Sequence, residues 1–331
     1  MSIERVRLHI KNNRAGEEIF RVTPERLADA RSRHPDADAW LDTTLEWDLD
    51  EFESHIGRAH GLVTWDLPTD DLAERAPNLR WIHIIGAGVE HLQPLGWVPE
   101  FVSITNNRGV HADKAAEYGL MAVLMLNNSI PDLVTMQRRR TYVERFTSTL
   151  AGTTLVVVGP GHMGSAVAAA VRPFGVRTVG VARTPGDRPG FDEMVTTDDL
   201  DAVLPGADFM LVTTPLTAET RGLIDERRFG LMQAGVGIIN MGRAPVIDED
   251  ALVSAIESGH VSGAVLDVFE PEPLPSTSRL WDLPNVVMTP HMSSDDAVHY
   301  TPKTLDLVFE NARRLHTGEP LINVVDLTLG Y

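Results

Sequence analysis

The chain has 331 residues, no cysteine and a formal net charge of −18 at pH 7. Without cysteine it forms no disulfide, no thiolate metal site and no cysteine nucleophile, and its histidines show no metal-ligand spacing. The negative charge argues against a nucleic-acid or anionic-membrane surface. The start, MSIERVRLHI, has no apolar signal core, and no apolar run is long enough to span a bilayer. We therefore expect a cytoplasmic protein with no membrane partner.

The first hundred residues predict a small α/β unit. Short β-rich runs occur in RVRLHI, HGLVTW, LRWIHIIG and FVSITNN, at residues 5–10, 60–65, 79–86 and 101–107. The following stretch, residues 115–130, is apolar around most of its circumference. It predicts a buried helix at a domain junction or a subunit interface.

From residue 155 to 290 the chain alternates apolar runs with helical stretches, which predicts a parallel sheet covered on both faces. The expected strands are 155–159, 178–182, 209–214, 236–241, 263–269 and 285–290. Three glycines, Gly175, Gly230 and Gly259, precede strands and are expected to end helices. The segment 301–320 predicts a last helix, closed by Gly318, that packs back on the first unit.

A glycine fingerprint follows the strand 155–159. Residues 159–164 read GPGHMG and open a helix. In this strand–turn–helix context Gly159 makes the tight turn, Gly161 lets the backbone approach a pyrophosphate, and Gly164 permits close helix–strand packing. The helix N-terminus adds N–H groups and a positive dipole end. The sequence therefore predicts a bound dinucleotide.

The strand 178–182 lacks the acidic residue that binds the ribose 2′-hydroxyl of NAD. Ala182, Arg183 and Thr184 stand in its place. Arginine suits a 2′-phosphate, because guanidinium binds phosphate bidentately and a hydroxyl adds a donor. We therefore expect NADP(H), while NAD remains possible if Arg183 is only a solvated loop residue.

Three polar residues follow three expected strands. Arg243 follows 236–241, Glu272 follows 263–269, and His291 follows 285–290. In an open parallel sheet, ligands bind outside the carboxyl ends of the strands. A cation, a carboxylate and an imidazole gathered there suit an anion clamp with an oriented acid–base.

These motifs resemble the D-isomer-specific 2-hydroxyacid dehydrogenase family over nearly the whole chain. The markers are IIGAGVEHL (84–92), NNRGVHADKAAEYGL (106–120), VVVGPGHMG (156–164), TTPLTAETRGLI (213–224), NMGRAPVIDEDAL (240–252), LDVFEPEPLP (266–275) and TPHMSS (289–294). The pair Arg183–Thr184 is similar to the NADPH-preferring glyoxylate/hydroxypyruvate reductases and related 2-ketoacid reductases.

The resemblance implies reduction of a small 2-oxo acid to a D-2-hydroxy acid, with no metal. Arg243 would bind the substrate carboxylate and polarise the carbonyl, His291 would be the general acid, or the base in reverse, and Glu272 would fix its tautomer and favour its protonated form. Backbone groups of Ala87 and Gly88 would hold the other side of the carboxylate. Positions implied at the cofactor are Gly159, Gly161, His162, Met163, Gly164, Arg183, Thr184, Thr214, Pro215, Thr220, Met241, Gly242, Arg243, Asp267, His291 and Ser293. Among these, Asp267 would bond the nicotinamide amide.

The resemblance also implies the architecture. A Rossmann-type parallel-sheet cofactor domain, residues 104–296, would be inserted into a smaller flavodoxin-like substrate domain formed by 1–103 and 297–331, with the substrate in a cleft between them and a homodimer formed through the cofactor domains. The family usually has glycine after the arginine that matches Arg243, where this chain has Ala244. A positive φ at that position would strain alanine.

Two other functions are weighed. Formate dehydrogenase is disfavoured by Glu272, because that branch carries glutamine there. A dinucleotide-sensing corepressor of the same fold stays open, since such relatives keep the Arg, Glu and His set; the absence of a long disordered tail and of a basic surface argues against it. The physiological substrate, its preferred direction and the oligomer size are not set by the sequence.

Overall fold

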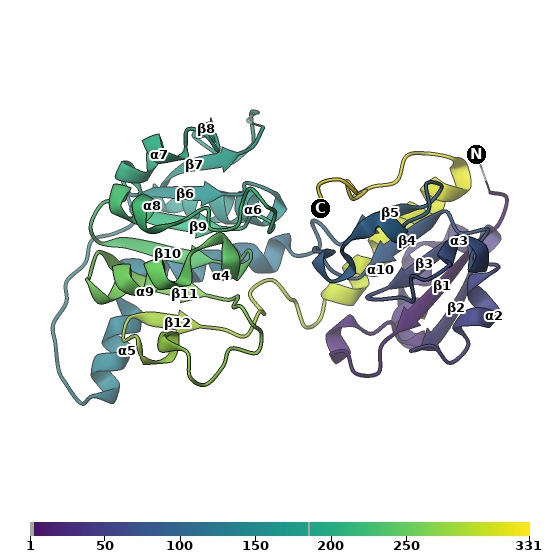
Figure 1. Cartoon of the computed structure of the whole chain (residues 1–331), viewed down its shortest axis with the longest axis horizontal. Helices are drawn as coiled ribbons and strands as arrows, with labels where there is room; N and C mark the ends of the chain where they lie inside the picture. The colour runs from purple at the N-terminus through teal and green to yellow at the C-terminus, as the bar shows by residue number, and fades with distance from the viewer. Residues whose placement is uncertain (1–2, 185) are drawn as a thin grey trace. The chain divides into compact units, whose positions relative to one another are not determined.

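The structure, a computed structural model, describes residues 3–184 and 186–331; the first two residues of the predicted small domain and Pro185 lie outside the described residues. The chain divides into two compact units (Figure 1). Unit 1 comprises Met1–Val110 and Asp296–Tyr331, and unit 2 comprises His111–Asp295.

The boundaries between the two units differ slightly from the predicted ones, which lay between residues 103 and 104 and between residues 296 and 297. The strand β5 (Ser103–Asn106) pairs within the sheet of unit 1, and the chain leaves that unit only after Val110. It re-enters at Asp296, whose carboxylate accepts hydrogen bonds from the backbone N–H groups of Val298 and His299 just before the last helix.

Unit 2 contains a seven-stranded sheet in the order β12-β11-β10-β9-β6-β7-β8, with neighbouring strands parallel. The strands are β6 (Thr154–Val158), β7 (Arg177–Ala182), β8 (Glu193–Thr196), β9 (Phe209–Val212), β10 (Val236–Asn240), β11 (Val261–Leu266) and β12 (Val286–Met288). The winding reverses between β6 and β9, and this reversal is the switch point at which doubly wound folds bind ligands.

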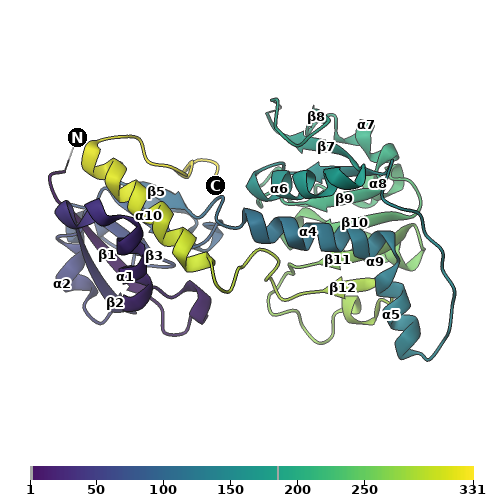
Figure 2. The ribbon, with the colours of Figure 1, turned by 180° about the vertical axis from the view of Figure 1, so that it is seen from behind.

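Helices cover both faces of this sheet (Figures 1 and 2). They are α4 (Ala112–Asn127), α5 (Ile130–Arg138), α6 (His162–Val171), α7 (Leu200–Val203), α8 (Glu226–Leu231) and α9 (Glu249–Glu257). Successive strand residues point to opposite faces. Val156 and Val158 therefore pack in one cluster with α7, α8 and α9, whereas Leu155 and Val157 pack in another with α4 and α6.

Unit 1 contains a five-stranded parallel sheet in the order β2-β1-β3-β4-β5. Its other strands are β1 (Val6–Asn12), β2 (Leu41–Trp47), β3 (Gly61–Thr64) and β4 (Trp81–Ile84). One face packs on α1 (Pro24–Arg33) and α10 (Tyr300–Thr317), and the other packs on α2 (Phe52–Ile56) and α3 (Leu72–Arg75). This strand order is that of flavodoxin-like folds, so the predicted fold class is confirmed.

Some local expectations were wrong. Strands β2 and β8 were missed because both are edge strands whose exposed polar residues interrupt the apolar pattern. Gly230 lies inside α8 and does not end it. Gly175 and Gly318 do take the left-handed conformation after helical segments, as expected.

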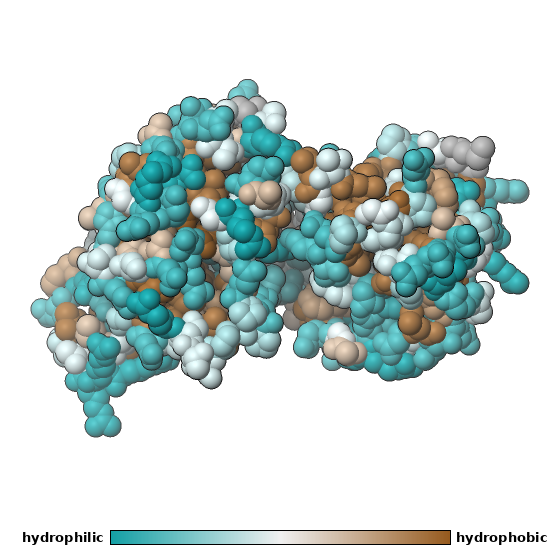
Figure 3. Space-filling view, viewed as in Figure 1, coloured by the Kyte–Doolittle hydropathy of each residue, from teal (hydrophilic) through white to brown (hydrophobic). Residues whose placement is uncertain are grey.

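The visible face of the molecule is mostly hydrophilic, with hydrophobic residues in separate patches (Figure 3). None of the described helices is alone long and apolar enough to cross a membrane; α4 and α5 pass that test only when taken together across a 66° bend.

Candidate active site

The ends of β10, β11 and β12 bring the predicted catalytic residues to one edge of the sheet. The register pairs Asn240 with Leu266 and Leu266 with Met288 across these strands. Arg243 and His291 each stand three residues beyond that row, and Glu272 stands six beyond it. Because neighbouring strands are about 4.8 Å apart, the three loops start within about 10 Å of one another.

His291 and Glu272 form a hydrogen-bonded pair. The imidazole Nδ1 lies 2.9 Å from Glu272 Oε2. The other carboxylate oxygen, Oε1, accepts the Phe269 backbone N–H at 2.9 Å, so the carboxylate is held by its own loop. A carboxylate only accepts, so Nδ1 carries the proton and Nε2 is left to exchange a proton with a ligand. The His291 side chain is 46% exposed, which leaves it accessible.

Arg243 leaves the end of β10 in an extended conformation. Its Nη1 donates to the Gly242 carbonyl at 2.8 Å, and the Asn240 side chain bridges the turn through the Gly242 N–H and the Arg243 carbonyl, at 3.1 and 3.3 Å. The guanidinium is half-buried. Ala244 begins a 3-10 turn, Ala244–Val246, and takes no positive φ, so alanine is accommodated here without strain.

Asp267 is buried beneath the loop that carries His291. It is 1% exposed, and its carboxylate accepts hydrogen bonds from the Thr289 hydroxyl at 2.6 Å, the Met292 N–H at 2.9 Å and the Ser293 N–H at 3.0 Å. A carboxylate has about four acceptor positions, so three are already used by the chain. The contact of Asp267 with a nicotinamide stays a prediction, and the structure gives this residue a second role in holding the loop.

The glycine loop has the geometry that its sequence predicts. Gly159 has φ +93°, and a side chain there would meet the Thr214 backbone N at 2.6 Å. At Gly164 a side chain would meet the Gly159 carbonyl at 2.6 Å, because α6 packs closely on the strand. At Gly161, by contrast, a side chain would meet nothing within 4 Å. The helix N-terminus at His162 and Met163 therefore opens onto free space, which fits the pyrophosphate of a dinucleotide.

The loop after β9 lies against the glycine loop. The Thr213 hydroxyl donates to the Gly159 carbonyl at 2.6 Å. Within the loop, the Thr220 hydroxyl donates to the Pro215 carbonyl at 2.7 Å, so it shapes the turn that holds Thr214 and Pro215. Gly242 lies so close to this loop that an added Cβ would meet the Thr214 carbonyl oxygen at 2.8 Å. The neighbouring Met241 side chain is buried in the core.

Two arginines, Arg183 and Arg188, stand in the loop that follows β7. Arg183 and Thr184 follow β7 and are exposed. Arg188, farther along the same loop, donates to the Pro160 carbonyl. A hydrogen bond from the Thr217 hydroxyl, a backbone hydrogen bond and the positive charge of Arg183 lower the pKa of the Glu219 carboxyl, which places that acid within electrostatic reach of Arg183.

Ala87 and Gly88 belong to unit 1. They follow β4, and the Asn106 side chain donates to the Ala87 carbonyl at 2.7 Å, which fixes the turn. Their part in a substrate site stays a prediction. Sequence reasoning missed Tyr118 and Thr289, which contact the Asp267 region; the only signal was a phenol in a helix that is apolar around most of its circumference.

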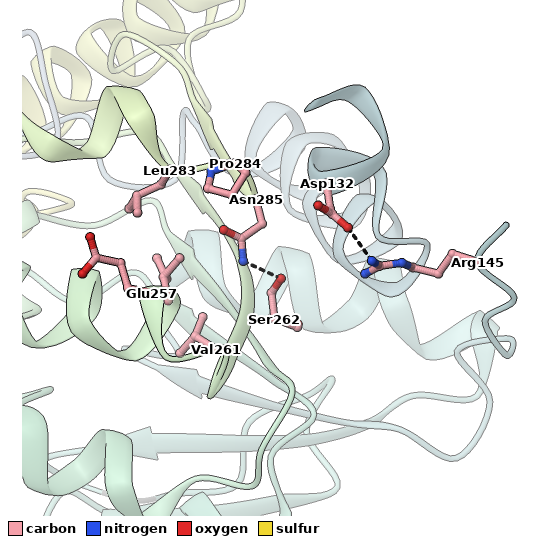
Figure 4. Close-up of a pocket in the computed structure, with 10 residues that line it drawn as sticks. Asp132, Arg145, Glu257, Val261, Ser262, Leu283, Pro284 and Asn285 are labelled. Atoms are coloured by element: carbon pink, nitrogen blue, oxygen red, sulfur yellow. Dashed lines mark hydrogen bonds and ion pairs between the residues drawn. The ribbon is translucent and has the colours of Figure 1, made fainter. Parts of the chain in front are cut away.

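A pocket of about 510 Å³ lies elsewhere in unit 2 (Figure 4). Its lining includes Val261, Ser262 and Asn285, at the amino ends of β11 and β12, and the ion pair of Asp132 with Arg145 at 2.6 Å. The candidate site lies at the carboxyl ends of these strands, so the pocket is separate from it. Across residues 3–184 and 186–331 no cluster of three or more metal-ligating side chains occurs.

A doubly wound parallel sheet, a glycine loop at its switch point and a paired imidazole and carboxylate at the same edge define a dinucleotide-binding protein equipped for acid–base chemistry. Comparison with known proteins agrees with that class. Residues 120–293 match the family model "D-isomer specific 2-hydroxyacid dehydrogenase, NAD binding domain". Glyoxylate/hydroxypyruvate reductase A of Serratia proteamaculans is 28% identical over 277 residues, which cover 81% of this chain and 87% of that protein.

Two solved structures are similar over almost the whole chain. A D-isomer specific 2-hydroxyacid dehydrogenase of Xanthobacter autotrophicus, in complex with NADPH and MES, has a TM-score of 0.83 at 30% identity and covers 98% of this chain and 99% of its own. The NADPH-dependent glyoxylate/hydroxypyruvate reductase of Sinorhizobium meliloti, with NADP and sulfate, has a TM-score of 0.80 at 26% identity, with coverage of 98% and 99%. The protein belongs to the D-isomer specific 2-hydroxyacid dehydrogenase family of oxidoreductases, and unit 2 contains its NAD-binding domain.

Proposed function

We propose that the protein reduces short 2-oxo acids to D-2-hydroxy acids with NADPH. The observation that carries this proposal is the His291–Glu272 pair at the sheet edge that also carries the glycine loop and Arg243. In that setting an imidazole with one nitrogen fixed by a carboxylate is a proton donor of defined orientation. The NADPH complexes of similar enzymes support the choice of cofactor.

The cofactor fits the residues present. The open space at Gly161 and the N-terminus of α6 suit the pyrophosphate, and the loop of Thr214, Pro215 and Thr220 would lie beside the adenosine half. Arg183 and Thr184 would bind the 2′-phosphate. When bound, the cofactor supplies the hydride that reaches C2 of the substrate.

The residues of the chain bind the substrate and transfer the proton. Arg243 binds the substrate carboxylate and polarises the 2-oxo group. His291 Nε2 gives a proton to the carbonyl oxygen, and Glu272 stabilises the imidazolium from which that proton comes. Backbone N–H groups at Ala87 and Gly88 hold the second side of the carboxylate. In the reverse direction His291 Nε2 takes the proton from the hydroxyl.

We also propose a homodimer formed through unit 2. Residues 139–153 connect α5 to β6 without helix or strand, and their first part, residues 139–149, is here called the arm (Figures 1 and 2). Every residue from 137 to 149 is exposed. Tyr142 and Phe146 in the arm are 92% and 91% exposed. Aromatic side chains with so large an exposed fraction favour burial against a partner. The partner that the family resemblance implies is a second copy of the chain.

The test of the reaction is an initial-rate assay on the purified protein. NADPH and NADH are each supplied with glyoxylate, hydroxypyruvate, pyruvate and longer 2-oxo acids, and the loss of reduced-nicotinamide absorbance is followed. We expect turnover with glyoxylate or hydroxypyruvate and a higher kcat/KM with NADPH. Cofactor binding without turnover of any 2-oxo acid would contradict the proposal and favour a dinucleotide-sensing role.

A further inference from the structure

A chain of partly buried hydrogen bonds runs from helix α4 to the loop that carries His291. The Tyr118 hydroxyl lies 2.6 Å from the Thr289 hydroxyl, which lies 2.6 Å from Asp267 Oδ1. Tyr118 is 7% exposed and Asp267 is 1% exposed. The proposed reaction assigns no role to either hydroxyl.

The direction of each hydrogen bond follows from chemistry. Asp267 accepts from two backbone N–H groups as well, so it acts as an acceptor and Thr289 must donate to it. Thr289 has one hydroxyl proton, so it must accept from Tyr118. Burial raises the pKa of Tyr118 to about 12, and the nearby Asp267 acts in the same direction, so the phenol keeps the proton that it donates.

The end of this chain holds the backbone around the proposed acid. Asp267 receives the N–H groups of Met292 and Ser293 on its carboxylate and the N–H of His291 on its own carbonyl, at 2.8 Å. His291 has φ +51°, a left-handed conformation that few residues other than glycine adopt. Residues kept in such conformations persist only where the surroundings over-determine them.

We propose that Tyr118 and Thr289 are positioning residues, which act through Asp267 to keep His291 in its left-handed backbone conformation with its imidazole on Glu272. The effect on catalysis rests on the proposed function, whereas the effect on the position of the His291 ring does not. Without the Thr289 hydroxyl, Asp267 loses a donor, and the turn relaxes toward conformations in which Nδ1 no longer meets the carboxylate. Neither hydroxyl touches a reacting atom.

The test compares Thr289→Val, Thr289→Ser and Tyr118→Phe with the wild type. A displacement of about 1 Å in a catalytic group costs about 100-fold in rate, so we expect kcat of Thr289→Val to fall by about that factor while KM for NADPH changes far less. Thr289→Ser keeps the hydroxyl and should recover most of kcat. Tyr118→Phe should lose less, and the double variant should be no slower than Thr289→Val, because both act through one chain.

A matched control is Thr178→Val. Thr178 is more deeply buried than Thr289, and its hydroxyl likewise donates a hydrogen bond inside unit 2, to the Gly190 carbonyl at 2.8 Å, but it lies at the amino end of β7. Thermal unfolding is measured for all variants. If Thr289→Val loses stability as Thr178→Val does but keeps wild-type kcat, Thr289 has only a structural role and the inference is wrong.

A second readout does not need turnover. NMR of ring-labelled histidine, with the His291 signal assigned from His291→Gln, reports whether Nδ1 stays hydrogen-bonded. We expect one sharp His291 environment in the wild type and exchange broadening or a shifted ring signal in Thr289→Val. An unchanged His291 signal would overturn the inference. If the wild type reduces no 2-oxo acid, the proposed function fails, and this readout still decides the inference.

Discussion

The imidazole of His291 presents one nitrogen to Glu272 and leaves the other for the reacting oxygen. Glu272 is itself held by the Phe269 N–H, so the pair does not depend on a mobile carboxylate. The orientation of a proton donor matters as much as its identity, because the proton must move along the developing O–H bond.

The first prediction concerns His291→Gln. Glutamine keeps a polar side chain but cannot transfer a proton, so kcat with glyoxylate should fall by about 100- to 10,000-fold. Binding of NADPH, followed by its fluorescence, should fall far less than kcat, because His291 is not needed for the pyrophosphate contacts. A loss of less than about threefold would exclude His291 as the general acid.

Arg183 is predicted to set the cofactor preference. Hydrogen bonds to charged groups contribute about 1.5–3 kcal/mol, so Arg183→Ala should lower kcat/KM for NADPH by about 10- to 150-fold and leave that for NADH nearly unchanged. Glu219→Gln, which removes the acid near Arg183, should shift preference the other way. Equal effects of Arg183→Ala on both cofactors would mean that Arg183 does not bind the 2′-phosphate.

The sequence indicates candidate residues most clearly where a polar side chain follows the end of a strand. Arg243, Glu272 and His291 are candidates because each stands after an apolar run, and the three glycines because their spacing has a geometric reason. The structure brings His291 and Glu272 into contact, while the catalytic roles of the three stay predictions. Tyr118 could not be paired with Thr289, since 171 residues separate them and only the packing of α4 against the sheet of unit 2 brings them together. The second role of Asp267 was missed for the same reason.

At the level of elements, the glycine loop joins β6 to α6 and meets the loop after β9. The two glycines Gly161 and Gly164 lie three residues apart but face different surroundings, since one opens onto free space and the other packs on backbone. The central strands of unit 2 were predictable because they are apolar on both faces, whereas β2 and β8 were not, because edge strands are half solvated.

Substitutions of Gly161 and Gly164 should therefore have different effects, the first mainly on NADPH binding and the second mainly on the stability of the fold. Gly161→Ala should lower stability by no more than about 1 kcal/mol, the cost of alanine at the N-cap of α6, because φ is −76° and an added Cβ would meet no atom within 4 Å. It should weaken NADPH binding by about tenfold or more, or about 1.4 kcal/mol. Gly164→Ala should instead destabilise the fold by about 1–3 kcal/mol. Calorimetric titration and thermal unfolding measure the two effects, and unweakened NADPH binding by Gly161→Ala would place the pyrophosphate elsewhere.

The arm gives a prediction about assembly. The double substitution of Tyr142 and Phe146 by serine removes the two most exposed aromatic side chains and should shift the protein from dimer to monomer in sedimentation velocity. Val298→Ser, at a residue that is 69% exposed in unit 1, is the control and should leave the sedimentation unchanged. A wild type that sediments as a monomer would contradict the proposed dimer.

At the level of the whole molecule, unit 1 contains a buried polar network that makes stability depend on pH. His83 is fully buried, its Nε2 lies 2.8 Å from Asn107 Oδ1, and its Nδ1 lies 2.9 Å from the Thr105 hydroxyl. Desolvation lowers the pKa of His83 to about 4, although the bond to Asn107 opposes this. The ring is therefore neutral in the folded protein over most of the pH range.

The sign of the effect follows from linkage. Because the folded-state pKa lies below the unfolded value of about 6.5, the stability is fully present above pH 6.5 and is lost as the pH falls toward 4. Between pH 7 and pH 4.5 the contribution of His83 to the free energy of unfolding should fall by about 2.5 kcal/mol. Urea unfolding at the two pH values measures it, and His83→Gln should reduce the difference by that amount. If the wild type and His83→Gln show the same pH dependence of the free energy of unfolding, groups other than His83 cause the acid sensitivity.

The division of the chain has a consequence for synthesis. Unit 1 is built from both ends of the polypeptide, and α10 supplies Leu305, Val308 and Phe309 to the core that also contains the β1 side chains. During translation the first 110 residues emerge without that helix, and they wait while all of unit 2 is made. Unit 2 is continuous and contains all its own strands, so it can fold on the ribosome. The first domain of the chain is therefore completed last. A truncation after residue 299, which removes α10 and the residues that follow it, should leave a folded unit 2 attached to an N-terminal segment that chaperones bind.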